Sequence, residues 1–259
     1  MSTRLLAFDG VENFRDYGDY ATAAGRRLVR RRLLRSGHHA RASDTDLAAF
    51  GALGVDVVVD LRRASERAAQ PSRRPQGFAG QVIESRDADL GEAPHIAFLR
   101  STDLTPDSVR GFMTETYRTM PFDARHVDLF TRYFAALAES DGAVLIHCAA
   151  GKDRTGLLAA LTHHLAGVGE ADALEDYLLT NTAVNLEARA PEVAAVIERN
   201  FGRRPSDAAT RAFLGVEAEY LAAAFAAVRE RHGSLDAYLR DVLGVGAELR
   251  ARIEARLCG

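Results

Sequence analysis

A cysteine and an arginine six positions apart, in a short loop between an apolar run and a helical pattern, constrain this chain more than any other feature. The loop, from His147 to Gly156, reads His-Cys-Ala-Ala-Gly-Lys-Asp-Arg-Thr-Gly and follows the apolar run 143–146. Small residues after the cysteine let backbone N–H groups face a ligand, and the following helix adds the positive end of its dipole. The pattern predicts an anion-binding loop with a nucleophile at its floor.

Two short apolar runs predict the centre of a sheet. Val55 to Val59 ends at Asp60, and Ala143 to Ile146 ends at His147 and Cys148. Their length and apolar content are typical of buried parallel strands, and open α/β sheets bind ligands at the carboxyl ends of such strands. We therefore expect an α/β fold with a central, mostly parallel sheet flanked by helices.

Helical patterns surround these strands. Ser43 is predicted to cap a helix over 44–53. An apolar stripe from Phe122 to Leu137 predicts a second helix, which ends at Asp141-Gly142. Beyond Gly167 the pattern is nearly all helical. A chain of 259 residues with 47% apolar content can fill one large core. We expect a single domain over 1–259 with a helical C-terminal part.

A polar segment that contains both a glycine and a proline, from Asn200 to Asp207, predicts a turn within this helical part. A helix pair hinged at the turn can cover the loop as a lid. The alternative is an ordinary surface turn between two core helices. Both interpretations stay open at the level of sequence.

Charge is divided unevenly along the chain but produces no overall basic surface. Residues 1–80 carry 14 arginines and 9 acidic residues, which gives this part a net charge of +5. The remainder carries 19 Lys+Arg and 27 acidic residues, so its net charge is −8 and that of the whole chain is −3. This distribution argues against nucleic acid as a partner. The arginine-rich stretch is interpreted as a solvated hairpin face, with steering of acidic lipids or phosphopeptides as the alternative. Its members are Arg26, Arg27, Arg30, Arg31, Arg32 and Arg35.

Cysteine content and the N-terminal sequence bear on the compartment. The two cysteines, Cys148 and Cys258, lie in the loop and next to the last residue, so a reducing compartment without a disulfide framework fits. The N-terminal sequence lacks a signal-peptide core, and no apolar run approaches membrane-spanning length. We predict a soluble, cytoplasmic protein without stable membrane insertion, while export by a route that needs no cleaved leader stays open.

The loop residues predict phosphate chemistry through a covalent intermediate. An ordinary thiol is only a few per cent ionised at pH 7, and the thiolate is the nucleophile. Inward-facing N–H groups from Ala149 to Arg154 would stabilise the anion of Cys148 and would also seat three phosphate oxygens. Ala149, Ala150 and Gly151 would thus bind phosphate through their backbone.

Three side chains of the loop have predicted roles beside the nucleophile. Arg154 is placed to clamp two phosphate oxygens with its planar guanidinium, a geometry that lysine cannot reproduce. Thr155 is expected to donate its hydroxyl to the sulfur when water cleaves the phosphocysteine. His147, whose side chain alternates away from Cys148, is expected to orient the loop from behind.

The leaving group needs a proton, and two aspartates are candidates for the general acid. Asp153 is the first choice because it lies in the loop next to Arg154 and would face the scissile oxygen. Asp60, at the end of the other strand, is the second. Its alternative role is an ion pair with Arg62 or with Arg154 that only shapes the site.

Lys152 is the single lysine among the 33 Lys+Arg residues, and it lies close to the predicted nucleophile. A monophosphorylated tyrosine needs no second cation at the rim of the loop, whereas a substrate with further phosphates or an acidic neighbour does. The residue therefore indicates phosphoinositide head groups as an alternative substrate class. The other interpretation is a solvated lysine without a role.

Three other classes of protein fit the loop less well. A nucleotide-binding P-loop would need glycine where Ile146 stands and Ser or Thr where Asp153 stands. A sulfurtransferase would not need an arginine six residues after its cysteine. A non-catalytic phosphate-binding module could dispense with Cys148 and Asp153. The adjacent histidine pairs have no chelating spacing, so no metal site is predicted.

The loop and four further segments of the chain together resemble the bacterial tyrosine phosphatase family. This family includes the mycobacterial protein tyrosine phosphatase B and the listerial lipid phosphatase. The likeness extends from Asn13 to the C-terminal helices. Its further segments are Asn13-Phe14-Arg15-Asp16, Leu34-Arg35-Ser36-Gly37, Asp60-Leu61-Arg62 and Tyr177-Leu178-Leu179-Thr180-Asn181.

This resemblance implies a cysteine-phosphatase α/β fold, no metal and no cofactor, and hydrolysis of phosphotyrosine with variable activity on phosphoserine, phosphothreonine and phosphoinositides. It implies that Cys148 is the nucleophile, that Arg154 binds phosphate, that Asp153 is the acid and that Lys152 broadens specificity toward lipid head groups. The expected partners are phosphotyrosine proteins or phosphoinositide head groups. The resemblance also implies a helical lid segment within 182–215.

Overall fold

A computed structural model describes residues 4–86, 91 and 93–258. Its centre is a five-stranded sheet with the strand order β1-β2-β5-β3-β4, mostly parallel, in which β1 alone runs antiparallel to its neighbour. The strands are β1 (Arg15–Asp16), β2 (Leu33–Ser36), β3 (Val55–Asp60), β4 (Gln81–Glu84) and β5 (Ala143–His147).

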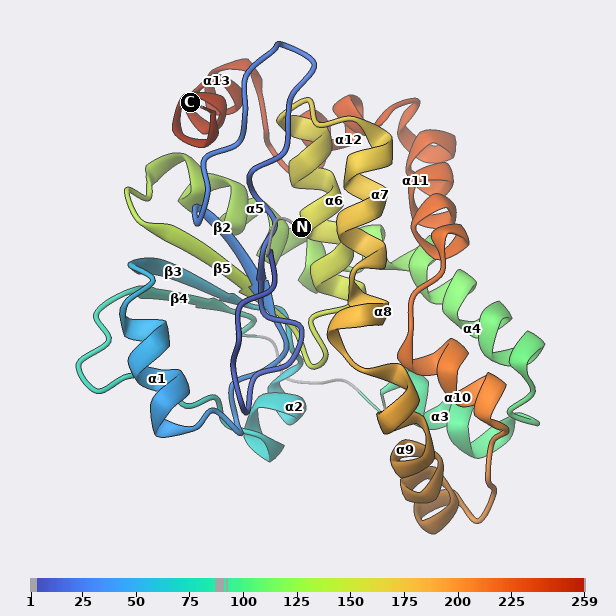
Figure 1. The fold of residues 1–259 in the computed structure, drawn as a ribbon. Coiled ribbons are helices and arrows are strands. Elements are labelled where there is room, and N and C mark those ends of the chain that lie inside the picture. The colour runs from blue at the N-terminus through green and yellow to red at the C-terminus, as the bar shows by residue number, and fades with distance from the viewer. Residues whose placement is uncertain (1–3, 87–90, 92, 259) are drawn as a thin grey trace.

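Helices cover both faces of this sheet and form the C-terminal part (Figure 1). Before β5 they are α1 (Asp44–Gly51), α2 (Ala64–Ala69), α3 (Pro94–Ser101), α4 (Pro106–Thr119) and α5 (Ala124–Glu139), with a 3₁₀ turn at Met120–Phe122. After β5 they are α6 (Asp153–Leu165), α7 (Glu170–Leu178), α8 (Thr180–Ala183), α9 (Leu186–Phe201), α10 (Asp207–Leu214), α11 (Ala218–His232), α12 (Leu235–Asp241) and α13 (Ala247–Leu257).

Both predicted strands are present, and each is one residue longer than its apolar run. Asp60 and His147 are the last residues of β3 and β5 and are paired with each other in the parallel register. The loop of interest therefore leaves the middle strand of the sheet at its carboxyl edge, where parallel α/β sheets present ligands. The predicted α/β class with a mostly parallel sheet is confirmed.

Strand alternation divides the core between the two faces of the sheet. Val57 and Val59 of β3 pack in the larger apolar cluster, which includes residues of α4, α5, α6 and α11. Val55 and Val58 belong to a second cluster, which includes Phe50 of α1. Successive side chains of a strand point to opposite faces, and a bulge between Val55 and Val57 offsets the pattern at one position.

The predicted helix boundaries hold within a few residues. Ser43 caps α1 with a capping box that Asp46 completes, but the helix ends at Gly51 instead of continuing to position 53. The second predicted helix starts later than expected because Asp123 caps α5 and leaves Phe122 in the 3₁₀ turn.

The predicted turn between 200 and 207 separates α9 from α10. Gly202 ends α9 in the left-handed region at φ 72°, and Ser206 caps α10 by accepting a hydrogen bond from the N–H of Ala209. The helix pair α9 and α10 lies with α3 at one end of the molecule, away from α13 (Figure 1). None of the described helices is long and apolar enough to cross a membrane.

A buried ion cluster ties the N-terminal strands to α7. Asp176 accepts from Arg15 Nε at 3.0 Å and from Arg35 NH1 at 2.6 Å, and all three side chains are at most 1% exposed. The assignment of Arg35 to a solvated hairpin face is therefore wrong. Its guanidinium is buried because β2 lies between β1 and β5 and points this side chain toward α7.

Candidate active site

The loop after β5 forms one wall of a cavity of about 640 Å³. The described lining includes Cys148, Ala149, Ala150, Lys152, Asp153 and Arg154. Helix α6 begins at Asp153, so the N-terminus of a 13-residue helix faces the loop. Cys148 is a free cysteine with 2% of its surface exposed, and that surface opens into the cavity.

The carbonyl groups of the loop are held by the surrounding scaffold. Asn13 donates from Nδ2 to the carbonyls of Ala150 (3.2 Å) and Gly151 (2.8 Å), and Arg35 donates to the latter at 3.0 Å. The N–H of His38 donates to the carbonyl of Ala149 at 3.0 Å. Because the carbonyls face these donors, the intervening N–H groups are left for a ligand, as in an anion-binding nest.

Gly151 makes this loop conformation attainable. Its φ is +66°, in the left-handed region that favours glycine, and a Cβ there would lie 2.3 Å from the carbonyl carbon and oxygen of Ser36. A larger residue at this position would push the loop off β2 and separate its carbonyls from Asn13 and Arg35.

The guanidinium of Arg154 is fixed by a residue that the sequence did not single out. Glu66 of α2 accepts two hydrogen bonds from Arg154, at 2.6 and 2.8 Å, and the carbonyl of Leu61 accepts a third at 3.1 Å. Such a bidentate pair sets both position and plane of the guanidinium. Glu66 lies in the segment that follows β3. Its position, as an acidic residue shortly after a strand end predicted to bind ligand, is the sequence feature that could have identified it as a site residue.

This pair remains ionised in acid. Burial favours the neutral form of Glu66, but the hydrogen bonds and charge of Arg154 outweigh it and lower the pKa of Glu66 to about 2. Burial likewise opposes the charge of Arg154, yet the hydrogen bonds that Arg154 donates to Glu66 and its electrostatic interactions with Cys148 and Glu66 raise the pKa of Arg154 above its ordinary value.

The Glu66→Gln variant is expected to lower kcat/KM by about 10- to 100-fold, because a guanidinium that is free to rotate no longer holds its phosphate-binding geometry. Steady-state kinetics with 4-nitrophenyl phosphate measures this loss. Glu84→Gln is the matched control, since Glu84 pairs with Arg67 while 49% exposed. Equal kinetics for both variants would contradict the positioning role of Glu66.

Asp153 lies where the sequence predicted, in the first turn of α6 and on the cavity wall. Its side chain is 25% exposed, and its Oδ1 accepts a hydrogen bond from the hydroxyl of Tyr117 at 3.0 Å. The carboxyl is thus close to the loop and reachable from the cavity, as a general acid must be.

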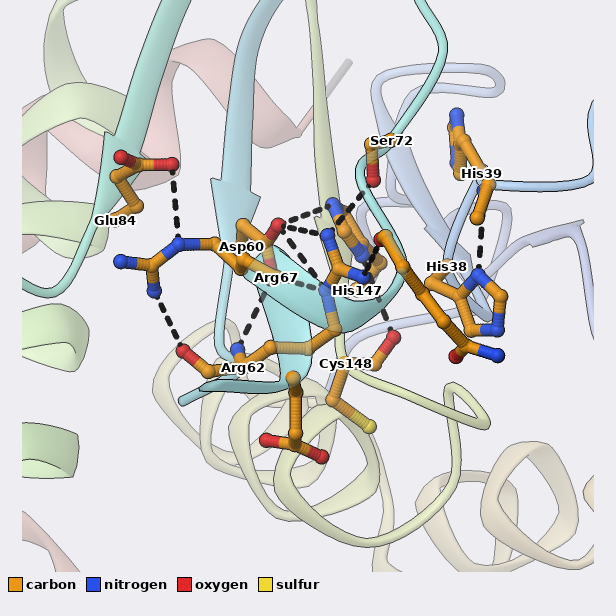
Figure 2. Close-up of polar contacts among 12 residues, drawn as sticks. His38, His39, Asp60, Arg62, Arg67, Ser72, Glu84, His147 and Cys148 are labelled. Atoms are coloured by element: carbon orange, nitrogen blue, oxygen red, sulfur yellow. Dashed lines mark hydrogen bonds and ion pairs between the residues drawn. The ribbon is translucent and has the colours of Figure 1, made fainter. Parts of the chain in front are cut away.

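Asp60 occupies a different environment, behind the loop. Its carboxylate accepts from Arg62 at 2.6 and 2.9 Å and lies 3.6 Å from Nε2 of His147. In Figure 2 the sulfur of Cys148 points away from this cluster, and Asp60 is absent from the described cavity lining. Burial opposes ionisation, but His147 and Arg62 lower the pKa of Asp60, which disfavours a proton donor. This geometry favours the ion pair with Arg62.

His147 lies behind the loop, as strand alternation predicted. It is fully buried, and its Nδ1 is 3.3 Å from the carbonyl oxygen of Cys148. Burial lowers the pKa of His147 to about 4, so the ring is neutral at pH 7.

Two further loop residues differ from expectation. Lys152 is 5% exposed, which rules out the solvated alternative; its ammonium donates to the carbonyls of Phe213 and, at 3.1 Å, Gly215 at the end of α10. The hydroxyl of Thr155 is buried and makes no hydrogen bond with a described residue, so the predicted bond to the sulfur is not formed in this structure.

The rest of the cavity is largely apolar, with arginines among its walls. Apolar side chains come from α4, the 3₁₀ turn and the end of α10. These residues are Phe112, Met113, Met120, Phe122, Phe213 and Leu214, and the cations are Arg63, Arg125 and Arg231. A flat aromatic group attached to a phosphate matches this combination of a polar floor and apolar walls.

Nearly the whole chain, and not only the loop, matches known phosphatases. The model of the tyrosine phosphatase family matches residues 6–259. The chain belongs to the tyrosine phosphatase family. Membership confirms the family and the cysteine-phosphatase fold expected from the sequence, and it identifies the protein as a phosphatase enzyme.

Three relatives within the tyrosine phosphatase family cover most of the chain. A chain of Cupriavidus necator that carries the name of a tyrosine-protein phosphatase is 36% identical over 95% of this chain and 86% of its own length. The triple specificity protein phosphatase PtpB of Mycobacterium tuberculosis is 35% identical over 96% and 98%. A tyrosine-protein phosphatase of Nostoc commune is 31% identical over 84% and 71%.

Proposed function

We propose that this protein hydrolyses phosphotyrosine monoesters through a phosphocysteine intermediate. The observation that carries the proposal is the joint placement of Cys148 and Arg154 on one cavity wall, in a loop whose carbonyls are bound by the scaffold. This arrangement leaves a sulfur, a fixed guanidinium and a set of N–H groups around one phosphate-sized position.

In the first step the thiolate of Cys148 attacks phosphorus, the bond to the phenolic oxygen breaks, and Asp153 gives its proton to the departing oxygen. In the second step water attacks the phosphocysteine, the carboxylate of Asp153 accepts a proton from that water, and the sulfur leaves as thiolate. Arg154 and the N–H groups of 149–154 stabilise the charge on the equatorial oxygens in both steps.

Phosphotyrosine is the substrate class that the cavity favours, because its ring would contact the apolar walls while its phosphate reaches the loop. The name of the mycobacterial relative, a triple specificity phosphatase, supports additional hydrolysis of phosphoserine and phosphothreonine by this chain. These shorter side chains would leave much of the apolar wall without contact and are expected to react more slowly.

Phosphoinositide head groups are the second candidate substrate, and the cations Arg63, Arg125 and Arg231 on the cavity walls favour them. Lys152 supports this candidate only if its ammonium leaves the carbonyls of Phe213 and Gly215. Such a release would accompany opening of 182–215 as a lid over the cavity, which is the proposed role of that segment.

The test is a parallel assay of the purified protein on a phosphotyrosine peptide, a phosphoserine peptide and a panel of phosphoinositides, with EDTA present. We expect the highest kcat/KM for the phosphotyrosine peptide and no effect of EDTA. A higher kcat/KM for a phosphoinositide would replace the first candidate by the second, and inactivity on all three classes would refute the proposal.

For Asp153→Asn, kcat/KM with phenyl phosphate is expected to fall about 10²- to 10⁴-fold, because the poor leaving group departs without a proton. With 2,4-dinitrophenyl phosphate, whose leaving group needs no proton, the loss is expected to be about tenfold or less. The matched control is Asp60→Asn. If that variant shows the dependence on leaving group and Asp153→Asn does not, the acid is Asp60.

A further inference from the structure

A buried tyrosine from a different helix holds one oxygen of the Asp153 carboxyl. Tyr117 lies at the C-terminal end of α4 and is 0% exposed, and its hydroxyl donates to Asp153 Oδ1 at 3.0 Å. The two residues are 36 positions apart in sequence. The buried hydroxyl of Tyr117 therefore forms a specific hydrogen bond with a carboxyl that faces the cavity, in addition to the packing of its ring.

The hydroxyl of Tyr117 is itself held by a second tyrosine. Tyr177 of α7 donates to it at 2.8 Å, so the proton of Tyr117 is committed to Asp153. Gly156 permits this approach: a Cβ there would lie 2.9 Å from the ring of Tyr177. The chain Tyr177, Tyr117, Asp153 therefore connects α7, α4 and the first turn of α6.

We propose that Tyr117 is a positioning residue for Asp153, which selects the carboxyl oxygen that carries the catalytic proton. This inference rests on the proposed function, in which Asp153 is the general acid. Because Oδ1 accepts from Tyr117, the proton of the neutral acid belongs on Oδ2, and no described residue donates a hydrogen bond to Oδ2.

The hydrogen bond also assists the proton transfer itself. As Asp153 loses its proton, charge develops on the carboxylate, and a hydrogen bond to an ionised acceptor is stronger than one to a neutral acceptor. Tyr117 keeps its own proton, because burial and the charge of Asp153 raise the pKa of Tyr117 well above its ordinary value. It therefore acts on Asp153 as a donor.

Other charged and titratable groups face the same carboxyl and belong in the interpretation of any kinetic change. Lys152 Nζ lies 3.5 Å from Oδ1, on the same oxygen that Tyr117 holds. Electrostatic interactions also link Asp153 to Arg154, His95 and Tyr220. None of these side chains forms a described hydrogen bond with the carboxyl, so Tyr117 is the group whose removal changes its orientation.

The experiment compares Tyr117→Phe with the wild type over a series of aryl phosphates. We expect kcat/KM for phenyl phosphate to fall about tenfold and that for 2,4-dinitrophenyl phosphate to fall less than about twofold. The phenylalanine ring keeps the aromatic contacts with Tyr177 and Tyr220, whose ring centroids lie 6.2 and 5.7 Å away.

Tyr133→Phe is the matched control. Tyr133 is also 0% exposed, and its hydroxyl forms hydrogen bonds of 2.9 Å with Tyr17 and with Thr162, outside the described cavity lining. Its loss of hydrogen bonds is expected to lower stability without changing the dependence on the leaving group. If Tyr117→Phe loses the same activity on phenyl phosphate as on 2,4-dinitrophenyl phosphate, Tyr117 has only a structural role and the inference is overturned.

The double variant Tyr117→Phe with Asp153→Asn separates this inference from the function on which it rests. If Tyr117 acts through Asp153, the Phe substitution costs no further activity in the Asn background. A further loss of about tenfold there would overturn the inference while the general acid stands. If Asp153→Asn alone loses no activity on phenyl phosphate, the assignment of the acid is wrong and the inference falls with it.

Discussion

Cys148→Ser is expected to reduce turnover of 4-nitrophenyl phosphate by at least about 10³-fold. A hydroxyl is a far weaker nucleophile than a thiolate. Asp153 carries the leaving-group proton in the first step, so it cannot at the same time act as the base that would activate a serine. The fold is expected to persist because serine is close to cysteine in size and the surroundings are held by the sheet. Activity measurements together with the urea unfolding midpoint test both expectations.

Cys258→Ser is the matched control for this variant. Cys258 is the other free cysteine, half-buried just after α13, where its backbone bridges to Leu28, and neither residue belongs to the described cavity lining. It is expected to keep full activity. Near-normal turnover in Cys148→Ser, or equal losses in both variants, would exclude a phosphocysteine intermediate at Cys148.

Asp176→Asn is expected to lower the free energy of unfolding by about 3 to 5 kcal/mol. Asp176 is fully buried and its carboxylate is shared by Arg15 and Arg35, which are also fully buried. Burial opposes the charge of Asp176, but the two arginines lower the pKa of this carboxyl, so it is ionised at neutral pH. The neutral amide would leave two desolvated guanidinium groups without a countercharge. Urea denaturation followed by circular dichroism measures the change.

The surface pair Arg240 and Asp241 provides the control, since both side chains are more than half exposed. Asp241→Asn is expected to leave the urea midpoint unchanged, because exposed ion pairs are screened by water. If Asp176→Asn also leaves the urea midpoint nearly unchanged, Arg15 and Arg35 have found other acceptors and the expected loss of stability is wrong.

The same variant is also expected to affect catalysis. Arg35 donates a hydrogen bond to the carbonyl of Gly151, so we expect a lower kcat/KM in Asp176→Asn under conditions where the protein remains folded.

The phosphate loop illustrates how much of the site is local in sequence. Cys148, Arg154 and Asp153 are close together in the chain, between an apolar strand and a helix start, so their spacing alone places them around one position. Asp60 and His147 are distant in the chain, but each follows a predicted apolar strand, and the two strands pair in register. What the sequence could not decide was the role of Asp60, because its partners Arg62 and His147 and its distance from the cavity depend on folding.

The sequence by itself determined the α/β class, the strand ends, the nucleophile loop and the candidate acid, since each follows from short-range periodicity or spacing. Only the tertiary structure decided which scaffold groups support that loop. Glu66 meets Arg154 across 88 positions and Arg35 meets Asp176 across 141, and Lys152 meets the end of α10 across 61. Contacts of this kind have no periodic signature, because chain crossovers and helix packing bring the partners together after local structure has formed.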